Sequence, residues 1–172
     1  MKDAILTAAI SVLADDGLNN WTIEEVAERA RCAKGLVNYH YRSKLDLLTR
    51  AANALRDDRH ARRLAALQAP GTAALDRLWQ VLLAEVESGW FAAWLAMASA
   101  EGPLRQGASG WEGRALAQAA SKALGVDLPP DSAYLIPGLL DGLELQLLLG
   151  VEPGAVEEAY HRAWTVVLGA GF

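Results

Sequence analysis

The chain has 172 residues, of which 52% are hydrophobic, and its formal net charge at pH 7 is −5. This length allows one domain or a small module on a larger one, and the apolar content excludes a disordered chain. The apolar stretches fall short of the roughly 18 to 20 residues that span a bilayer, and the N-terminus lacks the features of a signal peptide. The single cysteine, Cys32, excludes an internal disulfide, so we expect a cytoplasmic protein with no membrane partner.

Charge is distributed unevenly along the chain. Residues 29–63 contain ten basic and three acidic residues, whereas residues 64–172 contain five basic and twelve acidic residues. A basic block on an acidic remainder indicates two parts with separate roles. Chance clustering on a solvated helix face would give the same pattern.

The first forty residues predict three short helices. Residues 2–16 place apolar side chains on one helical stripe, and Gly17 ends this helix. Thr22 caps a second helix, and Glu25 completes a capping box three residues later. The turn "RCA" precedes a third helix that begins near Lys34. So short a turn forces the two helices to cross at a steep angle, which is helix-turn-helix geometry.

The third helix carries the residues that point to DNA. Val37 and Tyr41 can face the first two helices, which leaves polar and small residues outward. Asn38 suits bidentate contact with adenine, and Lys34 suits a phosphate or a guanine. Each residue alone fits an ordinary solvated surface, but together they favour DNA. The expected DNA-binding residues are Thr22, Arg31, Ala33, Lys34, Gly35, Leu36, Asn38, Tyr39, His40 and Lys44.

A fourth helix follows at residues 44–61, with Ser43 as its cap. Lys44 lies in its first turn, where the helix dipole favours an acid, and this placement suggests an anion nearby. The apolar stripe expected for this helix consists of Leu45, Leu48, Ala52 and Leu55.

The stretch "TIEEVAERARCAKGLVNYHYRSKLDLL" resembles the N-terminal domain of TetR-type transcriptional regulators, and the resemblance covers roughly residues 1 to 50. It implies an all-α homodimer with a three-helix helix-turn-helix head at residues 1–45. The fourth helix would join this head to a larger helical domain, at residues 46–172, that binds an effector and dimerises. Members are mostly repressors that a small ligand releases from DNA. The sequence departs from the family pattern at Arg31, Ala33 and Asn38, where Gly, a capping Ser and Tyr are common.

The sequence after residue 64 predicts further helices. We expect "PLRQGASG" and "GVDLPPD" to be loops, with a helix between them at residues 111–124. A long apolar segment at residues 131–149 contains Pro137, which should kink the helix or mark its start. A last helix begins near Pro153.

Tryptophans in this larger part indicate a cavity for a small-molecule effector. An aromatic box with an acid suits an apolar or cationic ligand, although the same tryptophans would serve equally well as core. The expected ligand-binding residues are Trp79, Trp90, Trp94, Met97 and Trp111. Candidate polar groups in the cavity are Glu85, Glu87, Ser99, Glu101 and Gln118.

The last two helices favour dimerisation, because each carries apolar residues at near-heptad spacing. Two such helices from each of two chains would bury these faces in a four-helix bundle; the alternative is that they cover only the chain's own core. The expected interface residues are Leu139, Leu143, Leu147, Val156, Tyr160, Trp164 and Val167.

The sequence lacks the motifs of catalytic, metal and phosphate-binding sites, so we expect no enzyme, no metal and no cofactor. The function that we expect is a ligand-responsive transcriptional regulator. It would bind a palindromic operator in double-stranded DNA as a homodimer, most plausibly as a repressor, with the fourth helix as its lever. The alternative is a helical ligand-binding dimer that has lost DNA binding and acts through another partner.

Overall fold

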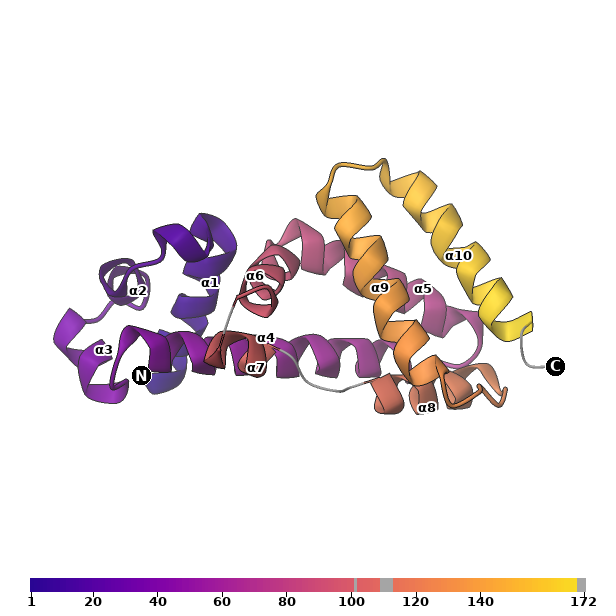
Figure 1. The fold of residues 1–172 in the computed structure, drawn as a ribbon, viewed down its shortest axis with the longest axis horizontal. Helices are drawn as coiled ribbons and strands as arrows, with labels where there is room; N and C mark the ends of the chain where they lie inside the picture. The colour runs from indigo at the N-terminus through magenta and orange to yellow at the C-terminus, as the bar shows by residue number, and fades with distance from the viewer. Residues whose placement is uncertain (101, 109–112, 170–172) are drawn as a thin grey trace. The chain divides into compact units, whose positions relative to one another are not determined.

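The computed structural model describes residues 1–100, 102–108 and 113–169, and its regular structure in these ranges is entirely helical (Figure 1). The described helices are α1 (Lys2–Asn20), α2 (Ile23–Arg29), α3 (Lys34–His40), α4 (Lys44–Ala66), α5 (Thr72–Glu87), α6 (Trp90–Ala98), α7 (Pro103–Ala108), α8 (Gly113–Leu124), α9 (Ser132–Leu148) and α10 (Pro153–Gly169). The predicted all-α fold is confirmed. Among the described helices, none taken singly is long and apolar enough to cross a membrane.

The chain forms two compact units. The head consists of Met1–Asp58 and Ser88–Gly110, and the body consists of Arg59–Glu87 and Trp111–Phe172. Helix α4 contributes its first part to the head and its last part to the body.

The head is built around one apolar core under α1 to α4. Trp21 lies fully buried in this core, and its indole Nε1–H donates to Ala9 O at 2.9 Å. The first turns of α4 face the core through Leu47, whereas Leu45 is exposed. The predicted place of Leu45 in the buried stripe is therefore wrong. Two residues correspond to about 200° of helical rotation, so Leu45 and Leu47 lie on nearly opposite sides of α4.

Helix α6 completes the head by packing against α1. Gly89, directly before α6, adopts a left-handed backbone with φ of 74°, and a Cβ atom there would lie 2.7 Å from Ala14 O. Glycine therefore satisfies both the turn and the close approach to α1. The buried faces of α6 are formed by Phe91, Ala93 and Met97.

The body packs α5, α8, α9 and α10 around a second apolar core. Helices α9 and α10 run side by side in Figure 1. Tyr160 on α10 is fully buried, its ring lies 5.4 Å from the Trp79 ring, and its hydroxyl donates to Leu75 O at 2.8 Å. Burial raises the pKa of the Tyr160 phenol, so this hydroxyl stays a hydrogen-bond donor.

Helix α9 begins at Ser132 and continues through Pro137, so the proline does not mark its start. A proline has no backbone N–H, and Pro137 therefore cannot donate to Ala133 O within the helix. Gly113, the first residue of α8, packs against that carbonyl so closely that a Cβ atom there would lie 1.7 Å from Ala133 O.

The segment predicted to form a loop after residue 102 is in part helical, because α7 spans Pro103–Ala108. Proline is well tolerated in the first turn of a helix, where its missing N–H has no intrahelical partner. The predicted helix start at Trp111 lies outside the described residues.

Candidate nucleic-acid interface and ligand groove

Helix α3 is held on the head by two buried side chains. Val37 is fully buried, and the buried Tyr41 donates its hydroxyl to Lys2 O at 3.0 Å. Burial raises the pKa of Tyr41, so this donor stays protonated. The predicted anchoring of α3 through Val37 and Tyr41 is confirmed.

Helix α2 has the predicted capping box. The Thr22 side chain accepts from Glu25 N at 3.2 Å, and the Glu25 carboxylate accepts from Thr22 N at 3.0 Å. The Thr22 hydroxyl also donates to Glu25 Oε2 at 2.7 Å. Since this hydroxyl is already occupied by the cap, Thr22 would approach DNA mainly through its backbone.

The turn between α2 and α3 contains Arg31. Cys32 N–H donates to Ala27 O at 2.9 Å, and Arg31 N–H donates to Glu28 O at 3.0 Å. These two bonds form a Schellman motif, which places its C′ residue in the left-handed region. Arg31 accordingly has φ of 53° and is the one described non-glycine residue with positive φ. Glycine would fit this conformation without a steric cost.

The outer face of α3 presents the residues that the helical period predicts. Lys34, Gly35, Asn38 and Tyr39 are exposed, and Tyr39 is the most open of them at 82% exposure. Leu36 and His40 are half-buried at the margins. Ala33, at the N-cap, makes no side-chain capping hydrogen bond, because an alanine side chain has no acceptor.

Two of the predicted DNA-binding cations are engaged within the head. Lys34 forms an ion pair with Glu24 on α2, and this hydrogen bond lowers the pKa of Glu24. Lys44 donates its ammonium to Trp21 O at 2.6 Å and lies 5.3 Å from the centre of the Trp21 ring. These contacts account for Lys44 in the first turn of α4 without an anion.

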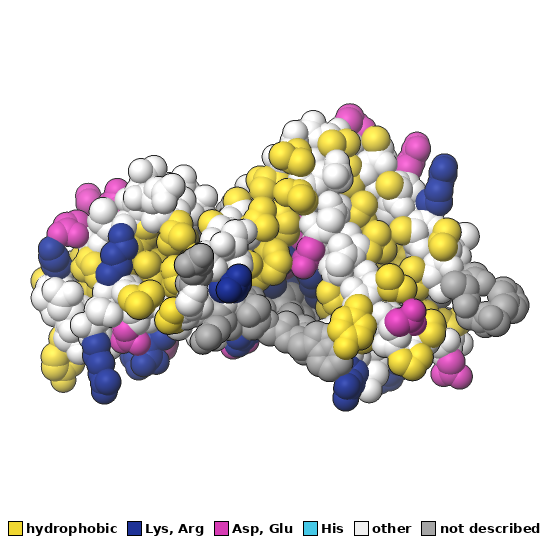
Figure 2. All heavy atoms as spheres, viewed as in Figure 1, with side chains coloured by type: hydrophobic (Ala, Val, Ile, Leu, Met, Phe, Trp, Pro, Cys, Tyr) yellow, Lys and Arg dark blue, Asp and Glu magenta, His cyan; other side chains and the backbone are white. Residues whose placement is uncertain are grey.

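Fewer cations of the basic block at residues 29–63 are available to bind DNA than its composition suggests. Arg29 pairs with Asp15, Arg50 pairs with Asp46 at 2.9 Å, and two further arginines are buried in the body. Arg31 and Arg42 are exposed and form no ion pair with any described residue. Arg42 follows α3 directly, so it belongs to the candidate DNA surface although sequence reasoning did not select it. Figure 2 shows Lys and Arg side chains on the lower left, where α3 and the first turns of α4 lie.

The structure places the predicted ligand-binding residues in both units. Trp79 is buried in the core of the body. Trp90, Trp94 and Met97 lie on α6 of the head; Met97 is fully buried, and the two tryptophans are half-buried. Trp111 and Glu101 lie outside the described residues.

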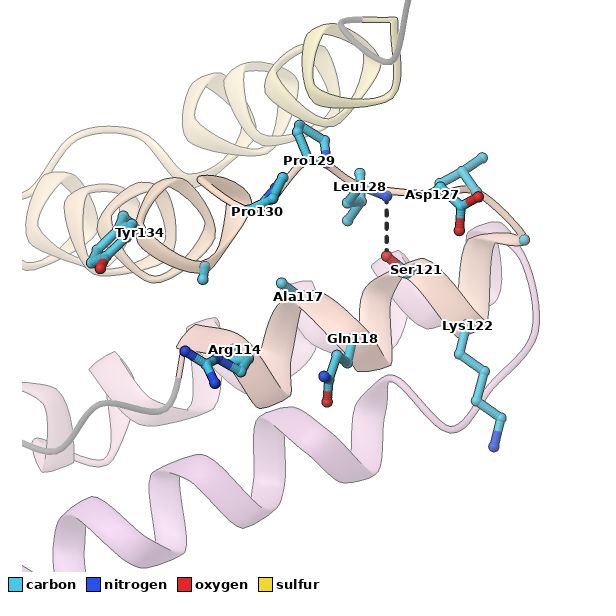
Figure 3. A pocket seen from close by; sticks show the side chains of 13 residues that line it. Arg114, Ala117, Gln118, Ser121, Lys122, Asp127, Leu128, Pro129, Pro130 and Tyr134 are labelled. Carbon is cyan, nitrogen blue, oxygen red and sulfur yellow. Dashed lines mark hydrogen bonds between the residues drawn. The ribbon is translucent and has the colours of Figure 1, made fainter.

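An open groove of about 900 Å³ lies in the body between α8 and the start of α9 (Figure 3). Its walls include Arg114, Gln118, Lys122, Asp127, Leu128, Pro129, Pro130 and Tyr134. The Ser121 hydroxyl accepts from Leu128 N at 3.3 Å and fixes the loop against α8. The walls of the groove carry two cationic side chains, Arg114 and Lys122, and one carboxylate, Asp127.

Four predicted interface residues are core residues of a single chain. Leu143, Val156, Tyr160 and Trp164 are buried in the body itself, so they offer little or no surface to a second chain. Leu139, Leu147 and Val167 are half-buried against the same core. Packing within the chain's own core therefore accounts for the buried residues of α9 and α10.

The exposed side of α9 is formed by residues other than the predicted interface residues. It carries no charge, because Asp141 and Glu144 are the only charged residues between 132 and 149, and both side chains form ion pairs with buried arginines. The exposed residues of this α9 face are Tyr134, Leu135, Gly138, Gly142, Leu145, Gln146, Leu148 and Leu149. Figure 2 shows hydrophobic side chains gathered over α9 and α10.

Comparisons with known proteins agree with this geometry. Residues 5–51 match the family described as "Bacterial regulatory proteins, tetR family". No curated protein matches the chain. A transcriptional regulator from Pseudomonas aeruginosa PAO1 is 26% identical over 99% of this chain and 90% of its own, with a TM-score of 0.67.

Two further solved structures are similar over nearly their whole length. The multidrug binding protein EbrR complexed with ethidium is 26% identical over 94% of this chain and 96% of its own, with a TM-score of 0.69. A transcriptional regulator from Rhodococcus sp. Rha1 is 24% identical over 99% and 97%, with a TM-score of 0.76. Residues 5–51 thus match the N-terminal domain of that family, and the chain as a whole has the fold of these solved structures.

Proposed function

We propose that the protein is a ligand-responsive transcriptional regulator that binds an operator through α3 and represses transcription. The observation that carries this proposal is the exposed face of α3, which presents Lys34, Asn38 and Tyr39 from a helix anchored by Val37 and Tyr41. A rigidly held short helix with such residues outward can enter the DNA major groove. Arg31 and Arg42 would meet the flanking phosphates.

The proposed DNA-binding form is a homodimer joined through the α9 face. This face is uncharged and includes Tyr134 at 69% and Leu149 at 70% exposure. Exposed apolar surface of this kind marks protein–protein contacts. Two recognition helices about one DNA turn apart, roughly 34 to 36 Å, would then read the halves of a palindromic operator.

The proposed effector is a small apolar or cationic molecule. Support comes from EbrR, a multidrug binding protein of this fold whose structure contains ethidium, a planar aromatic cation. The half-buried Trp90 and Trp94 on α6 supply aromatic surface for such a molecule. Ethidium titration, followed by quenching of tryptophan fluorescence, tests this class of ligand. The titration is done without DNA, because ethidium intercalates.

The effector would act by population shift. Helix α4 contributes to both units without a break, so a ligand that favours one conformer of either unit can bias the position of α4. The shift cannot exceed the difference in the ligand's affinity for the two conformers. Effector-saturated protein should therefore release operator DNA that the free protein holds.

The experiment that tests DNA binding is fluorescence anisotropy on duplex from the region upstream of the gene, against scrambled duplex, over a salt series. A preference of about a thousandfold, with a salt slope equivalent to several phosphate contacts, is expected. Equal, weak binding to both duplexes, and to duplexes selected from random sequence, would leave the alternative of a ligand-binding helical dimer without DNA binding. The small number of unpaired cations on the head is the observation that favours this alternative.

Two variants separate base reading from phosphate binding. Asn38→Ala should relax the preference at one base pair and leave the salt slope unchanged. Arg42→Ala should weaken binding to all sequences and reduce the salt slope by about one. Lys44→Ala is a less clean probe of phosphate binding, because Lys44 also holds Trp21 O.

A further inference from the structure

The body contains a buried cluster of five charged side chains from three helices. Arg59 and Arg63 come from α4, Glu85 comes from α5, and Asp141 and Glu144 come from α9. Both arginines are almost completely buried, and Glu85 and Glu144 are both 0% exposed. Asp141 is the only member that reaches solvent to a sizeable extent.

The arginines hold the acids through short, charge-assisted hydrogen bonds. Arg59 donates from Nε to Glu85 Oε2 at 2.9 Å and from Nη2 to Glu144 Oε2 at 2.7 Å. Arg63 donates from Nη2 to Glu144 Oε2 at 2.6 Å and to Asp141 Oδ1 at 3.0 Å. The cluster therefore fastens the last part of α4 to both α5 and α9.

The cluster contains one more carboxyl group than guanidinium groups. Three carboxyl groups face two guanidinium groups, so full ionisation would leave one negative charge uncompensated within the body. An uncompensated buried charge is costly, and buried acids in this situation take up a proton instead.

The hydrogen bonds indicate where the extra proton lies. Oε2 of Glu144 accepts from both arginines, whereas its Oε1 is buried and receives no N–H donor from the described residues. The neighbouring Glu85 side chain raises the pKa of Glu144. Two carboxyl groups can form a hydrogen bond only when one of them carries a proton.

We propose that Glu85 and Glu144 share one proton, and that this proton is a structural component of the clamp that holds α4 in the body. One shared proton leaves two negative charges against two positive charges and supplies the missing donor between the two carboxyl groups. The clamp therefore consists of five side chains and one proton taken from solvent. The side chains are those of Arg59, Arg63, Glu85, Glu144 and the partly exposed Asp141. This proposal stands independently of DNA binding.

The electrostatics of Glu144 point the same way. Its pKa is raised to about 9, mainly by burial; Arg63 and Arg59 oppose this rise in pKa, and Glu85 contributes to it. The groups that face it are Arg59 and Arg63 from α4, Glu85 from α5 and Asp141 from its own helix. A folded-state pKa above the unfolded value gives stability that is complete below the unfolded pKa and lost as pH rises through about 9.

The first test is infrared spectroscopy of the folded protein at neutral pH. A shared proton gives the C=O absorption of a protonated carboxylic acid, and this band should disappear in Glu144→Gln. The glutamine amide can donate where the proton was, and its carbonyl oxygen can still accept from the arginines. A spectrum without the band in the wild-type protein overturns the proposal.

The second test is the pH dependence of unfolding by urea for wild type, Glu144→Gln and Glu85→Gln. Between the ordinary carboxyl pKa and about 9, the wild-type unfolding constant should rise with pH by up to tenfold per pH unit. The unfolding constants of both variants should rise less steeply over this range. The double variant Glu85→Gln/Glu144→Gln should unfold far more readily than either single variant, because it leaves two guanidinium groups against one carboxylate.

Glu158→Gln, which removes an exposed carboxylate of α10, is the matched control and should keep the wild-type pH dependence. Two results contradict the shared proton. One is a single glutamine variant with the wild-type pH dependence, and the other is a double variant as stable as the single ones.

Discussion

Arg31 holds a backbone conformation that is unfavourable for its side chain. Its φ of 53° is imposed by the Schellman motif that ends α2 and leads into α3. A left-handed L-residue costs roughly 1 to 2 kcal/mol. The head thus keeps an arginine where glycine would fit better, which is consistent with a role for the guanidinium group on the surface beside α3.

Arg31→Gly should stabilise the head by about 1 kcal/mol, because glycine adopts positive φ without the steric cost. The same change should weaken binding to any duplex and reduce its salt slope by about one. Urea unfolding and anisotropy measure the two effects. Arg31→Ala separates them, since alanine removes the charge but keeps the backbone cost. Equal stability of the glycine and alanine variants would contradict the proposed strain.

In the proposed DNA complex, Glu24 would compete with phosphate for Lys34. The ion pair between them is exposed, and exposed pairs contribute little to stability, so Glu24→Gln should leave unfolding unchanged. It should, however, tighten binding to operator and scrambled duplex alike by severalfold, because Lys34 is released and a carboxylate is removed. Anisotropy at low salt measures this change. Glu28→Gln is the control, since Glu28 is exposed on the same helix and has no ion pair with a described residue; tightening of the same size in that variant would mean a general charge effect.

Single-residue reasoning from the sequence was accurate where local spacing decides the outcome. The helical period correctly placed Val37 inward and Asn38 and Tyr39 outward. It could not pair Lys34 with Glu24 or Lys44 with Trp21 O, because those contacts depend on how separate helices meet. The capping box at Thr22 was predictable since both of its partners are three residues apart.

At the scale of elements, the contact between α8 and α9 depends on a proline inside α9 and a glycine at the start of α8. Pro137 leaves Ala133 O without its intrahelical donor, and Gly113 provides the space in which α8 meets that carbonyl. The sequence predicts a kink or a helix start at this proline, because nothing local indicates that a glycine 24 positions earlier covers the Ala133 carbonyl.

Gly113→Ala should destabilise the body by about 1 to 3 kcal/mol or more, because its Cβ atom would lie 1.7 Å from Ala133 O and the helices would have to separate. Urea unfolding followed by circular dichroism measures the loss. Gly138→Ala is a suitable comparison, since a Cβ atom there has no neighbour within 4 Å. That variant should be neutral or up to about 1 kcal/mol more stable at low protein concentration. Equal losses in both variants would argue against the close junction.

Element boundaries were less predictable than element types. Pro103–Ala108 has no strong apolar period and its sequence predicts a loop, yet α7 forms there. The stripe of α4 was predicted with Leu45, although Leu47 is the residue that reaches the core. Both errors arise because short or apolar-rich segments allow more than one register, and tertiary packing selects between them.

For the whole molecule, the charge balance shows how composition and structure can differ. The basic block at residues 29–63 indicates a part of the chain with its own role, but Arg59 and Arg63 in it belong to the buried clamp. The acids that meet them lie far along the chain, at Glu85, Asp141 and Glu144. No local pattern links residues so distant, so the clamp could be found only in the folded chain.

The proposed dimer can be tested at Gly142. A Cβ atom at this position meets nothing within 4 Å, so Gly142→Gln should leave a single chain folded and favour the helix. In a dimer joined through the α9 face, the added side chain would separate the facing helices. Sedimentation velocity should then show monomer at concentrations where the wild type is dimeric. Ala73→Gln, on the exposed side of α5, is the control; a Gly142→Gln variant that dimerises normally would exclude this face.

The hydrogen bond from Tyr41 to Lys2 O joins the beginning of the chain to the end of α3. Lys2 is therefore part of the support of the helix proposed to read DNA. Deletion of Lys2 would remove the acceptor and leave a buried phenol without its partner. DNA binding measured on a protein that lacks Lys2 would therefore reflect a less firmly held α3.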